Sequence, residues 1–463
     1  MRGGEAAAAA RRGGLAAWRD RTSALVTDLL RSQTATRTAQ RGAVAAFSVR
    51  VASAAVLYLS QIVLARLMGG FEYGIYVFVW TWVLVLGGLS NLGMSTLMIR
   101  LVPEYRERGE FDHLRGLLMV GRLLPLGISL LIAGLAGAAL WWQGNLVAHH
   151  YVLPAFLALA CVPMIALSDV HDGIGRGRGW LVAALLPPYV LRPTLVLLAM
   201  AGAYAFGLPL TAVTAAGAAV AGTLVATLVQ LALIQSRLAR DVARGPAKRP
   251  VRLWLATSLP LLAITFSEIL LQNTDVLVVS QLMSPADVGI YFAAAKTMSL
   301  VMFVHYAVGS AMANQFATLN ARGDREGLET AVREAVTWTF WPSLATAALL
   351  LLAGPQLLSL FGPQFGAGYP VMSILAIGYL ARAAAGPSEL LLNMLGKQRA
   401  SAIVAITVAI LTISLNLLLV PLFGLKGAAI ATAAAMIVGV GLNTLVARRS
   451  LGLRIGIWSH LGR

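Results

Sequence analysis

Two stretches of the chain are near copies of each other: Leu67-Met-Gly-Gly-Phe-Glu-Tyr-Gly-Ile-Tyr76 and Leu282-Met-Ser-Pro-Ala-Asp-Val-Gly-Ile-Tyr291. Each begins with Leu-Met and ends with Gly-Ile-Tyr, and an acid stands two residues before the last glycine. Further along, Arg108-Gly-Glu110 returns as Arg322-Gly-Asp324 at nearly the same offset. Matching elements at near-constant spacing predict an internal duplication, so the chain should contain two similar halves.

The composition places both halves in a membrane. Of the 463 residues, 58% are hydrophobic and 12% are charged, and the mean hydropathy is +0.78. Soluble globular proteins have about 45–50% apolar and about 25% charged residues. The composition therefore excludes an ordinary soluble enzyme. The single cysteine, Cys161, excludes an internal disulfide and a cysteine-based metal site.

The predicted fold is an all-α polytopic membrane protein with about twelve transmembrane helices, since each span takes about 20 apolar residues. Six spans fall in each half, which gives two pseudo-symmetric six-helix bundles. Because six is even, both halves enter the membrane in the same orientation, as a parallel repeat. The predicted spans cover residues 43–66, 74–99, 116–140, 150–168, 180–203, 209–235, 253–282, 288–314, 333–354, 370–394, 400–421 and 426–447.

The distribution of basic residues predicts the topology. The chain has 36 Lys and Arg and 19 Asp and Glu residues, a net charge of +17. With the N-terminus in the cytoplasm, 29 of the 36 bases fall on that side, and only Arg66 and Lys426 fall on the other. This asymmetry follows the positive-inside rule. No aromatic residues interleave the basic clusters, so a nucleic-acid partner is not expected. We expect both termini in the cytoplasm.

The predicted domains follow from these spans. They are a basic cytoplasmic tail (1–41), an N-terminal six-helix lobe (42–236), a cytoplasmic linker (237–252), a C-terminal six-helix lobe (253–447) and a second cytoplasmic tail (448–463). The longest external loop runs from Gly354 to Tyr369 and contains Phe361 and Phe365, which predicts a position at the membrane surface. Two bundles with a cleft between them are typical of alternating-access carriers.

Five basic residues lie inside predicted spans, where a charge costs at least about 2.5–3.5 kcal/mol unless it faces water or a partner. Four of them are candidates for binding an anionic head: Arg50, Arg192, Lys296 and Arg382. Phosphates bind arginine through charge-assisted, often bidentate hydrogen bonds. For each of the four, the sequence leaves an alternative to substrate binding. The alternatives are that Arg50 snorkels to the interface, that Arg192 forms a structural pair between helices, that Lys296 pairs with an acid of a neighbouring span, and that Arg382 pairs with Glu389.

The surroundings of Arg192 favour a cavity. Pro187, Pro188 and Pro193 remove backbone donors and bend the helix. A broken helix that carries a charge at membrane depth is typical of a wall that lines water. The fifth base, Arg122, lies within two turns of the cytoplasmic end, so we expect it to snorkel.

Three polar residues, Glu268, Gln272 and Asp275, share one face of the seventh span at offsets of four and seven. Carboxylates inside carriers commonly bind a coupling ion, so Glu268 and Asp275 are candidates for binding H+ or Na+. The alternative is that they neutralise Lys296 or Arg382. Every charge predicted at mid-membrane depth in the N-terminal half is basic, which favours a substrate with an anionic head.

No catalytic or metal site is expected. Asp169-Val-His-Asp172 is assigned to a cytoplasmic loop, where the acids cap helices. His149-His150 has no third ligand for zinc, and no Walker motif or other cofactor site is present. No loop is long enough to carry the active site of a membrane glycan polymerase or glycosyltransferase, so the enzyme alternative is the weakest.

Four stretches of the sequence carry a resemblance to a known family. Arg66-Leu-Met-Gly-Gly-Phe-Glu-Tyr-Gly-Ile-Tyr76, Ser90-Asn-Leu-Gly-Met94 and Arg100-Leu-Val-Pro-Glu-Tyr105 resemble the first quarter of bacterial polysaccharide transporters. Thr274 to Tyr291, followed by Ala293-Ala-Ala-Lys296, resembles the start of their second half. These are lipid-linked oligosaccharide flippases of the O-antigen flippase type. Their superfamily, the multidrug/oligosaccharidyl-lipid/polysaccharide (MOP) exporters, also holds the lipid II flippase and MATE drug exporters.

The resemblance implies a multi-pass carrier of the bacterial cytoplasmic membrane. It would move an isoprenoid-diphosphate-linked oligosaccharide to the outer leaflet for surface polysaccharide synthesis, without hydrolysing ATP. Family members bind the anionic head with basic residues of the cavity, and Arg50 and Lys296 match that placement best. Expected partners are membrane lipid and the polymerase and chain-length machinery. The main alternative is a cation-coupled, MATE-like multidrug exporter, which the basic N-terminal cavity disfavours by repelling cationic drugs.

Overall fold

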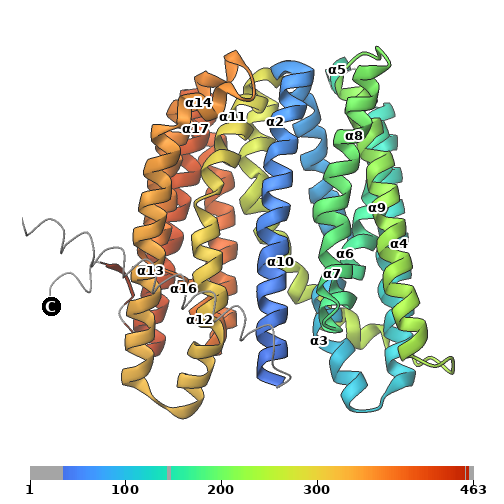
Figure 1. The fold of residues 1–463 in the computed structure, drawn as a ribbon, viewed down its shortest axis with the longest axis vertical. Helices are drawn as coiled ribbons and strands as arrows, with labels where there is room; N and C mark the ends of the chain where they lie inside the picture. The colour runs from blue at the N-terminus through green and yellow to red at the C-terminus, as the bar shows by residue number, and fades with distance from the viewer. Residues whose placement is uncertain (1–34, 143–147, 454, 458–463) are drawn as a thin grey trace, which may run out of the picture. The chain divides into compact units, whose positions relative to one another are not determined.

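The computed structural model describes the backbone of residues 35–142, 148–453 and 455–457, and the side chains from residue 52 onward except that of Asn314. Arg50 therefore lies outside the described side chains, and so does most of the N-terminal tail. Every regular element in the described residues is helical, as predicted (Figure 1). The elements are α2 (Ala35–Ser90), α3 (Met94–Glu107), α4 (Phe111–Trp142), α5 (His149–Leu159), α6 (Cys161–Gly177), α7 (Leu181–Leu186), the π-helical turn η1 (Pro187–Leu191), α8 (Arg192–Ala205), α9 (Ala212–Asp241), α10 (Val251–Leu282), α11 (Pro285–Ser299), α12 (Met302–Arg322), α13 (Arg325–Leu352), α14 (Gly354–Ser359), the 3-10 turn η2 (Pro363–Gly368), α15 (Tyr369–Ala384), α16 (Ser388–Met394) and α17 (Gln398–Leu451).

The helices are long and apolar enough for a polytopic membrane protein. Within the described residues, nine helical segments could cross a membrane, or ten if α5 and α6, which meet at a 42° bend, form one span. Each of the twelve predicted spans overlaps helical residues. The predicted number of twelve itself is not confirmed by this criterion.

Two of the long helices fold back on themselves at a glycine. Gly69 in α2 has φ 76° and ψ 167°, and Gly424 in α17 has φ 58° and ψ −136°. Twelve residues of straight helix span about 18 Å, yet the Tyr73 hydroxyl donates a 2.9 Å hydrogen bond to Oε1 of Gln61. A Cβ on Gly427 would lie 2.0 Å from the carbonyl oxygen of Leu419. Both helices are therefore hairpins.

The glycines and acids that the two repeats share lie at the ends of helices. Gly109 and Gly323, which occupy equivalent places, have φ near +70° and lie between consecutive helices. Asp287 accepts a 3.2 Å hydrogen bond from the backbone N–H of Ser284 and so caps α11. Glu72, its counterpart, accepts a 2.7 Å bond from the N–H of Ala212 at the start of α9. The acids of the repeat thus satisfy free N–H groups at helix starts.

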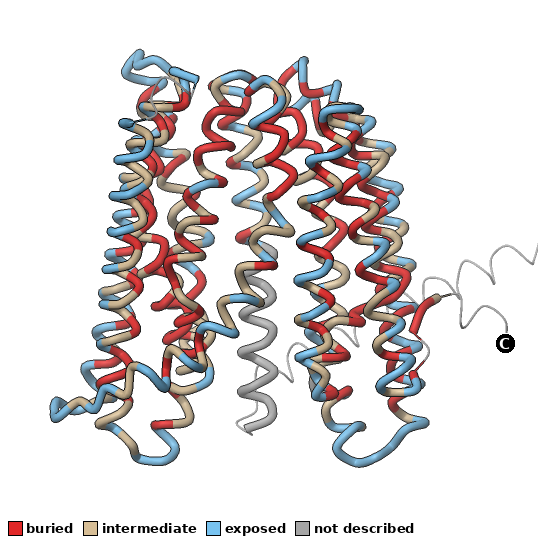
Figure 2. Tube along the Cα trace, turned by 180° about the vertical axis from the view of Figure 1, so that it is seen from behind, coloured by how far each residue is buried: buried red, intermediate tan, exposed pale blue. Residues whose placement is uncertain are grey.

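We name the two ends of the molecule after the predicted topology. The end with the turns near residues 69, 209, 284 and 362 is called the outer end, and the end with the turns near residues 109, 179 and 323 is called the inner end. The largest cluster of buried apolar side chains lies toward the outer end and draws on both halves, from Leu64 to Ala429. Toward the inner end each half has its own cluster, around Leu97 in the first and Val332 in the second. Buried residues of the two halves accordingly meet at the outer end (Figure 2).

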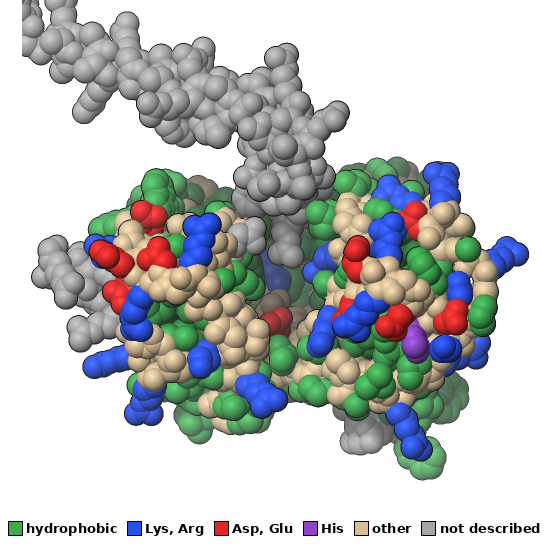
Figure 3. Space-filling model, turned by 90° about the horizontal axis from the view of Figure 1, so that it is seen from below, with side chains coloured by type: hydrophobic (Ala, Val, Ile, Leu, Met, Phe, Trp, Pro, Cys, Tyr) green, Lys and Arg blue, Asp and Glu red, His purple; other side chains and the backbone are tan. Residues whose placement is uncertain are grey.

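A hollow separates the two halves at the inner end. Figure 3 views residues of this end in space-filling form and shows the hollow between two groups of helices, with charged side chains around its rim and within it. The halves are thus joined at one end and apart at the other, which is the arrangement expected of a carrier open on one side of the membrane.

Helix α10 connects the two halves. Its first turns pack in the N-terminal half, where the buried Trp254 donates a 3.0 Å hydrogen bond to the Tyr105 hydroxyl. A Cβ on Gly93 would lie 2.2 Å from the Ser258 carbonyl oxygen. Its last turns pack against α17 in the C-terminal half. The predicted domain boundaries, including the lobe boundary at residue 253, stay predictions.

The segment from Gly354 to Tyr369 turns two of its aromatic side chains into the protein, and its predicted position at the membrane surface stays a prediction. Phe361 and Phe365 are fully buried. Phe361 packs edge-on against Tyr58 at 5.8 Å between ring centroids, and Phe365 packs against Tyr73 at 6.1 Å. The reason is that these rings fill the contact between the halves at the outer end, which composition alone could not reveal.

Candidate functional site

Arg192 follows a π-helical turn at its neighbouring prolines, but the helix is not broken there as predicted: residues 181–205 form one continuous helical segment. The turn η1, residues 187–191, is π-helical, and α8 begins at Arg192 itself. Single π-helical turns are frequent at functional sites. The guanidinium of Arg192 lies over the ring of Trp80, with Cζ 5.2 Å from the centroid. Tyr76 stacks on the same tryptophan at 6.2 Å.

Lys296 has the corresponding environment in the other half. Its amine lies 5.0 Å from the ring centroid of Phe292, one turn earlier in α11. Among the described side chains, no carboxylate lies within the 4.0 Å of a salt bridge to either Arg192 or Lys296. A cation on an aromatic face is stabilised by about 0.5–2 kcal/mol and keeps its charge available to another partner.

Both cations lie just inward of the closed outer end. Tyr73 contacts Phe292 across the halves at 6.4 Å between ring centroids. Trp80 is seven residues beyond Tyr73, which places it on the same helix face, about 10 Å further in. Lys296 is one turn inward of Phe292. A basic residue from each half therefore lies on an aromatic ring a few turns inward of the outer end, where the halves join.

Asp275, an ion-coupling candidate, is buried beside this region. One carboxylate oxygen accepts a 2.7 Å hydrogen bond from the Tyr291 hydroxyl, and the other accepts a 2.8 Å bond from the N–H of Val276. The charges of Asp275 and Lys296 act on each other. Tyr291 ends the Gly-Ile-Tyr motif of the second half, so the repeat supplies a partner for the carboxylate.

The other candidates lie elsewhere. Glu268, predicted to share a face with Asp275, is exposed whereas Asp275 is buried. Arg382 forms an ion pair with Glu389 at 3.5 Å, with both side chains about one third exposed. The predicted alternative for Arg382 is therefore present, and Glu268 lies where the charges of both residues act on it. The described residues contain no cluster of three or more potential metal ligands.

Two sequence-based interpretations in the N-terminal half are wrong. Asp169 and Asp172 are not in a loop, because α6 continues to Gly177; Asp172 pairs with Arg176 inside the helix. Asp169 lies where the charge of Arg192 acts on it, so this half is not purely basic.

Arg122, which is predicted to snorkel, donates a 3.0 Å hydrogen bond to Oε1 of Gln235 on α9. Its side chain therefore faces α9, and its position relative to a membrane interface stays a prediction. In the sequence, only the Asp-Val-His-Asp pattern points to Asp169 and Asp172. Their position inside the bundle follows from the packing of α6, which the pattern does not predict.

Comparison with known proteins supports the same architecture. Residues 39–313 match the family described as polysaccharide biosynthesis protein, and residues 260–418 match the MatE family. The chain belongs to the polysaccharide biosynthesis protein family. No curated protein sequence matches it.

Solved structures of similar fold are transporters of the MOP superfamily. An inward-facing MATE family transporter is 18% identical, with 88% of this chain and 98% of that chain covered and a TM-score of 0.70. An outward-facing MATE family transporter is 19% identical, with 89% and 95% covered and a TM-score of 0.62. A MOP superfamily transporter from Pyrococcus furiosus is 18% identical, with 92% and 97% covered and a TM-score of 0.61. The match to the polysaccharide biosynthesis protein family confirms the family resemblance read from the sequence, and the fold is that of these MOP superfamily transporters.

Proposed function

We propose that this family member is a flippase that moves a lipid-diphosphate-linked oligosaccharide from the inner to the outer leaflet of the bacterial cytoplasmic membrane. One observation carries the proposal: Arg192 and Lys296, from opposite halves, lie on aromatic rings inward of the joined outer end and form no described ion pair. We propose that both side chains face the hollow between the halves. Each cation can exchange its ring for a phosphate oxygen without leaving a carboxylate unpaired.

The cycle follows from the two-ended packing. With the inner end open, the diphosphate binds Arg192 and Lys296, while the isoprenoid stays in the bilayer. The halves then rock, so that the inner clusters meet and the shared outer core separates. The head is released outward, and the chain hydrolyses no ATP in this cycle. Arg50 and Arg382 are further proposed contacts for the head, with Arg382 exchanging Glu389 for phosphate.

A coupling ion is the proposed source of directionality. Asp275 is the stronger candidate for binding the ion, because it is buried and its charge acts on Lys296. Binding of H+ or Na+ at Asp275 or Glu268 would offset the carboxylate charge and strengthen the attraction of the cavity for an anionic head. We propose cytoplasmic termini on the basis of the positive-inside asymmetry.

The second candidate function is MATE-like export of cationic drugs, which the match of residues 260–418 to the MatE family favours. Arg192 and Lys296 oppose it, since a cationic drug would be repelled where these side chains lie. Asp169 and Asp275 would have to dominate the field of the cavity for this function to hold.

The test is flipping of a fluorescent lipid-diphosphate oligosaccharide in proteoliposomes. We expect Arg192→Ala with Lys296→Ala to lower the initial rate at least tenfold, since each lost charged hydrogen bond removes about 1.5–3 kcal/mol. The matched control is Lys426→Ala, which removes an exposed base at the outer end. An unchanged flipping rate in the double variant would contradict the proposal that these two bases bind the head. Export of ethidium by a wild-type protein that does not flip the lipid would favour the drug exporter.

A further inference from the structure

The repeated Gly-Ile-Tyr motifs bring their glycines together. A Cβ built on Gly74 would lie 1.6 Å from the carbonyl oxygen of Pro285, and one on Gly289 would lie 3.0 Å from the carbonyl oxygen of Gly70. Gly74 belongs to the second pass of α2, and Gly289 belongs to α11. The same position of each half therefore meets its counterpart where the halves join.

This crossing is a backbone-to-backbone contact that a side chain would prevent. Carbon–oxygen contacts between helices settle at about 3.3–3.6 Å, so a methyl group on Gly74 would force α2 and α11 apart by about 2 Å. Small residues let helix backbones approach this closely inside membranes. The two positions differ in tightness, so a methyl group should act more strongly at Gly74 than at Gly289.

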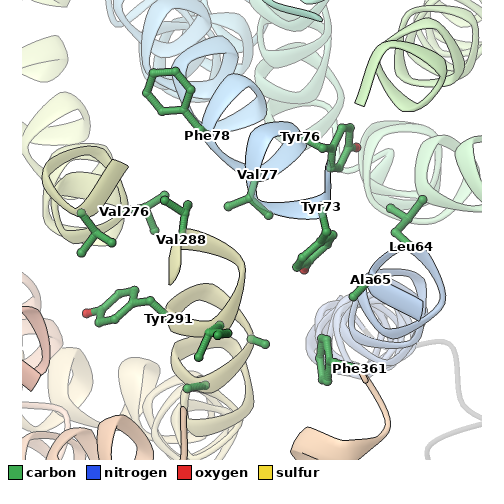
Figure 4. Close-up of a cluster of buried hydrophobic side chains, with 14 of the residues drawn as sticks. Leu64, Ala65, Tyr73, Tyr76, Val77, Phe78, Val276, Val288, Tyr291 and Phe361 are labelled. Carbon is green, nitrogen blue, oxygen red and sulfur yellow. The ribbon is translucent and has the colours of Figure 1, made fainter. Parts of the chain in front are cut away.

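The crossing is the centre of the outer seal. Tyr58 and Thr297, from opposite halves, share a hydrogen bond of 2.9 Å between their hydroxyl oxygens. Figure 4 shows Val77 and Val288 in the space between the two crossing helices, while Tyr291 points away from the crossing toward the helix of Val276. The glycine contact thus lets the surrounding side chains close over the hollow.

We infer that the glycine crossing sets which end of the carrier is open: its close contact holds the outer end shut, and its separation is the step that opens the outer end. The inference rests on the proposed alternating-access cycle but not on the identity of the substrate. A carrier with two states shifts toward the state in which an added group does not clash. One methyl group at Gly74 should therefore populate the outward-open state.

The experiment measures the distance between the outer ends of the halves without substrate. Spin labels are placed on Leu208→Cys and Leu360→Cys, which are exposed outer-end positions of the two halves, in a chain whose native Cys161 is buried. We expect Gly74→Ala to raise the ratio of long to short distances at least tenfold. Gly127→Ala is the matched control, since a Cβ there meets no heavy atom within 4 Å.

A second readout follows access from outside. A membrane-impermeant maleimide should label Thr81→Cys, a buried position inward of the crossing, faster in the Gly74→Ala background than in the Gly127→Ala background. If Gly74→Ala gives no folded protein, Gly289→Ala decides the matter, with a smaller shift in the same direction. Distances and labelling equal to those of the Gly127→Ala control would overturn the inference.

The outcome is independent of the flippase assay. A shifted distance distribution in Gly74→Ala, together with no flipping by the wild-type protein, would support the inference about the crossing and contradict the proposed substrate. Flipping that depends on Arg192 and Lys296, with no shift in Gly74→Ala or Gly289→Ala, would keep the substrate and remove the crossing.

Discussion

At the scale of single residues, Arg192 and Lys296 are stabilised by the same kind of contact, a cation over an aromatic ring. A cation at membrane depth needs a partner, and each of these rests on an aromatic ring. Arg382 instead pairs with Glu389. The difference separates two cations without a described carboxylate partner from one that is already paired, and for this reason we propose Arg382 as the weaker substrate contact.

The geometry of Arg192 gives a graded prediction. Arg192→Lys keeps the charge but loses the planar fork that binds phosphate bidentately and stacks on Trp80. We expect KM for the lipid-diphosphate substrate to rise about tenfold, the equivalent of about 1.4 kcal/mol, and Arg192→Gln to raise it further. Arg322→Lys, at an exposed position of the inner end, serves as the control; equal KM values in all variants would show that Arg192 does not contact the head.

Asp275 and its hydrogen bond give a prediction on ion coupling. Asp275→Asn removes the charge that would hold H+ or Na+, so flipping should lose its dependence on that ion's gradient. Tyr291→Phe removes one hydrogen bond to the carboxylate, worth about 1.5–3 kcal/mol for a charged acceptor, and should shift the ion concentration for half-maximal rate. Glu329→Gln, at an exposed site, should do neither; an intact gradient dependence in Asp275→Asn would exclude this site.

The sequence predicts some of these residues and not others. Arg192 is found from its prolines, and the Arg382–Glu389 pair from its spacing. Asp169 and the buried Phe361 and Phe365 are not found, because their depth is set by contacts between helices far apart in the chain. Local periodicity reports only which side of its own helix a residue occupies.

At the scale of helices, the hairpin turn of α2 depends on Gly69. Its φ of 76° with ψ of 167° belongs to a region that is essentially reserved for glycine, and a Cβ there would meet no atom within 4 Å. Backbone strain alone should therefore make Gly69→Ala less stable by about 1–3 kcal/mol, seen as a lower Tm in detergent. Gly127→Ala, inside α4, should be neutral or stabilising, and a Tm drop of equal size there would contradict the argument.

The apolar segments of the sequence predict where helices lie, since membrane spans must satisfy their backbone internally. They do not predict the positive-φ break at Leu92 and Gly93, after which α3 continues to Glu107. Nor do they predict that α10 starts in one half and ends in the other. That path is decided by Trp254 packing among side chains of α3 and α4.

At the scale of the whole molecule, the halves share one core toward the outer end and have separate cores toward the inner end. This is the packing expected of the proposed carrier when it is open on one side. The internal repeat predicts the two halves, and the structure shows which contacts the repeated residues make. Its glycines make the crossing, its acids cap helices and its second tyrosine holds Asp275.

The most direct measurement is equilibrium binding of a short-chain isoprenoid-diphosphate sugar to the purified protein, beside a monophosphate analogue and an organic cation. The account predicts saturable binding of the diphosphate, weaker binding of the monophosphate and none of the cation, with at least a tenfold loss of diphosphate affinity when Arg192 and Lys296 are both replaced by alanine. Cation binding in the wild-type protein, with a diphosphate affinity indifferent to those two residues, would contradict it.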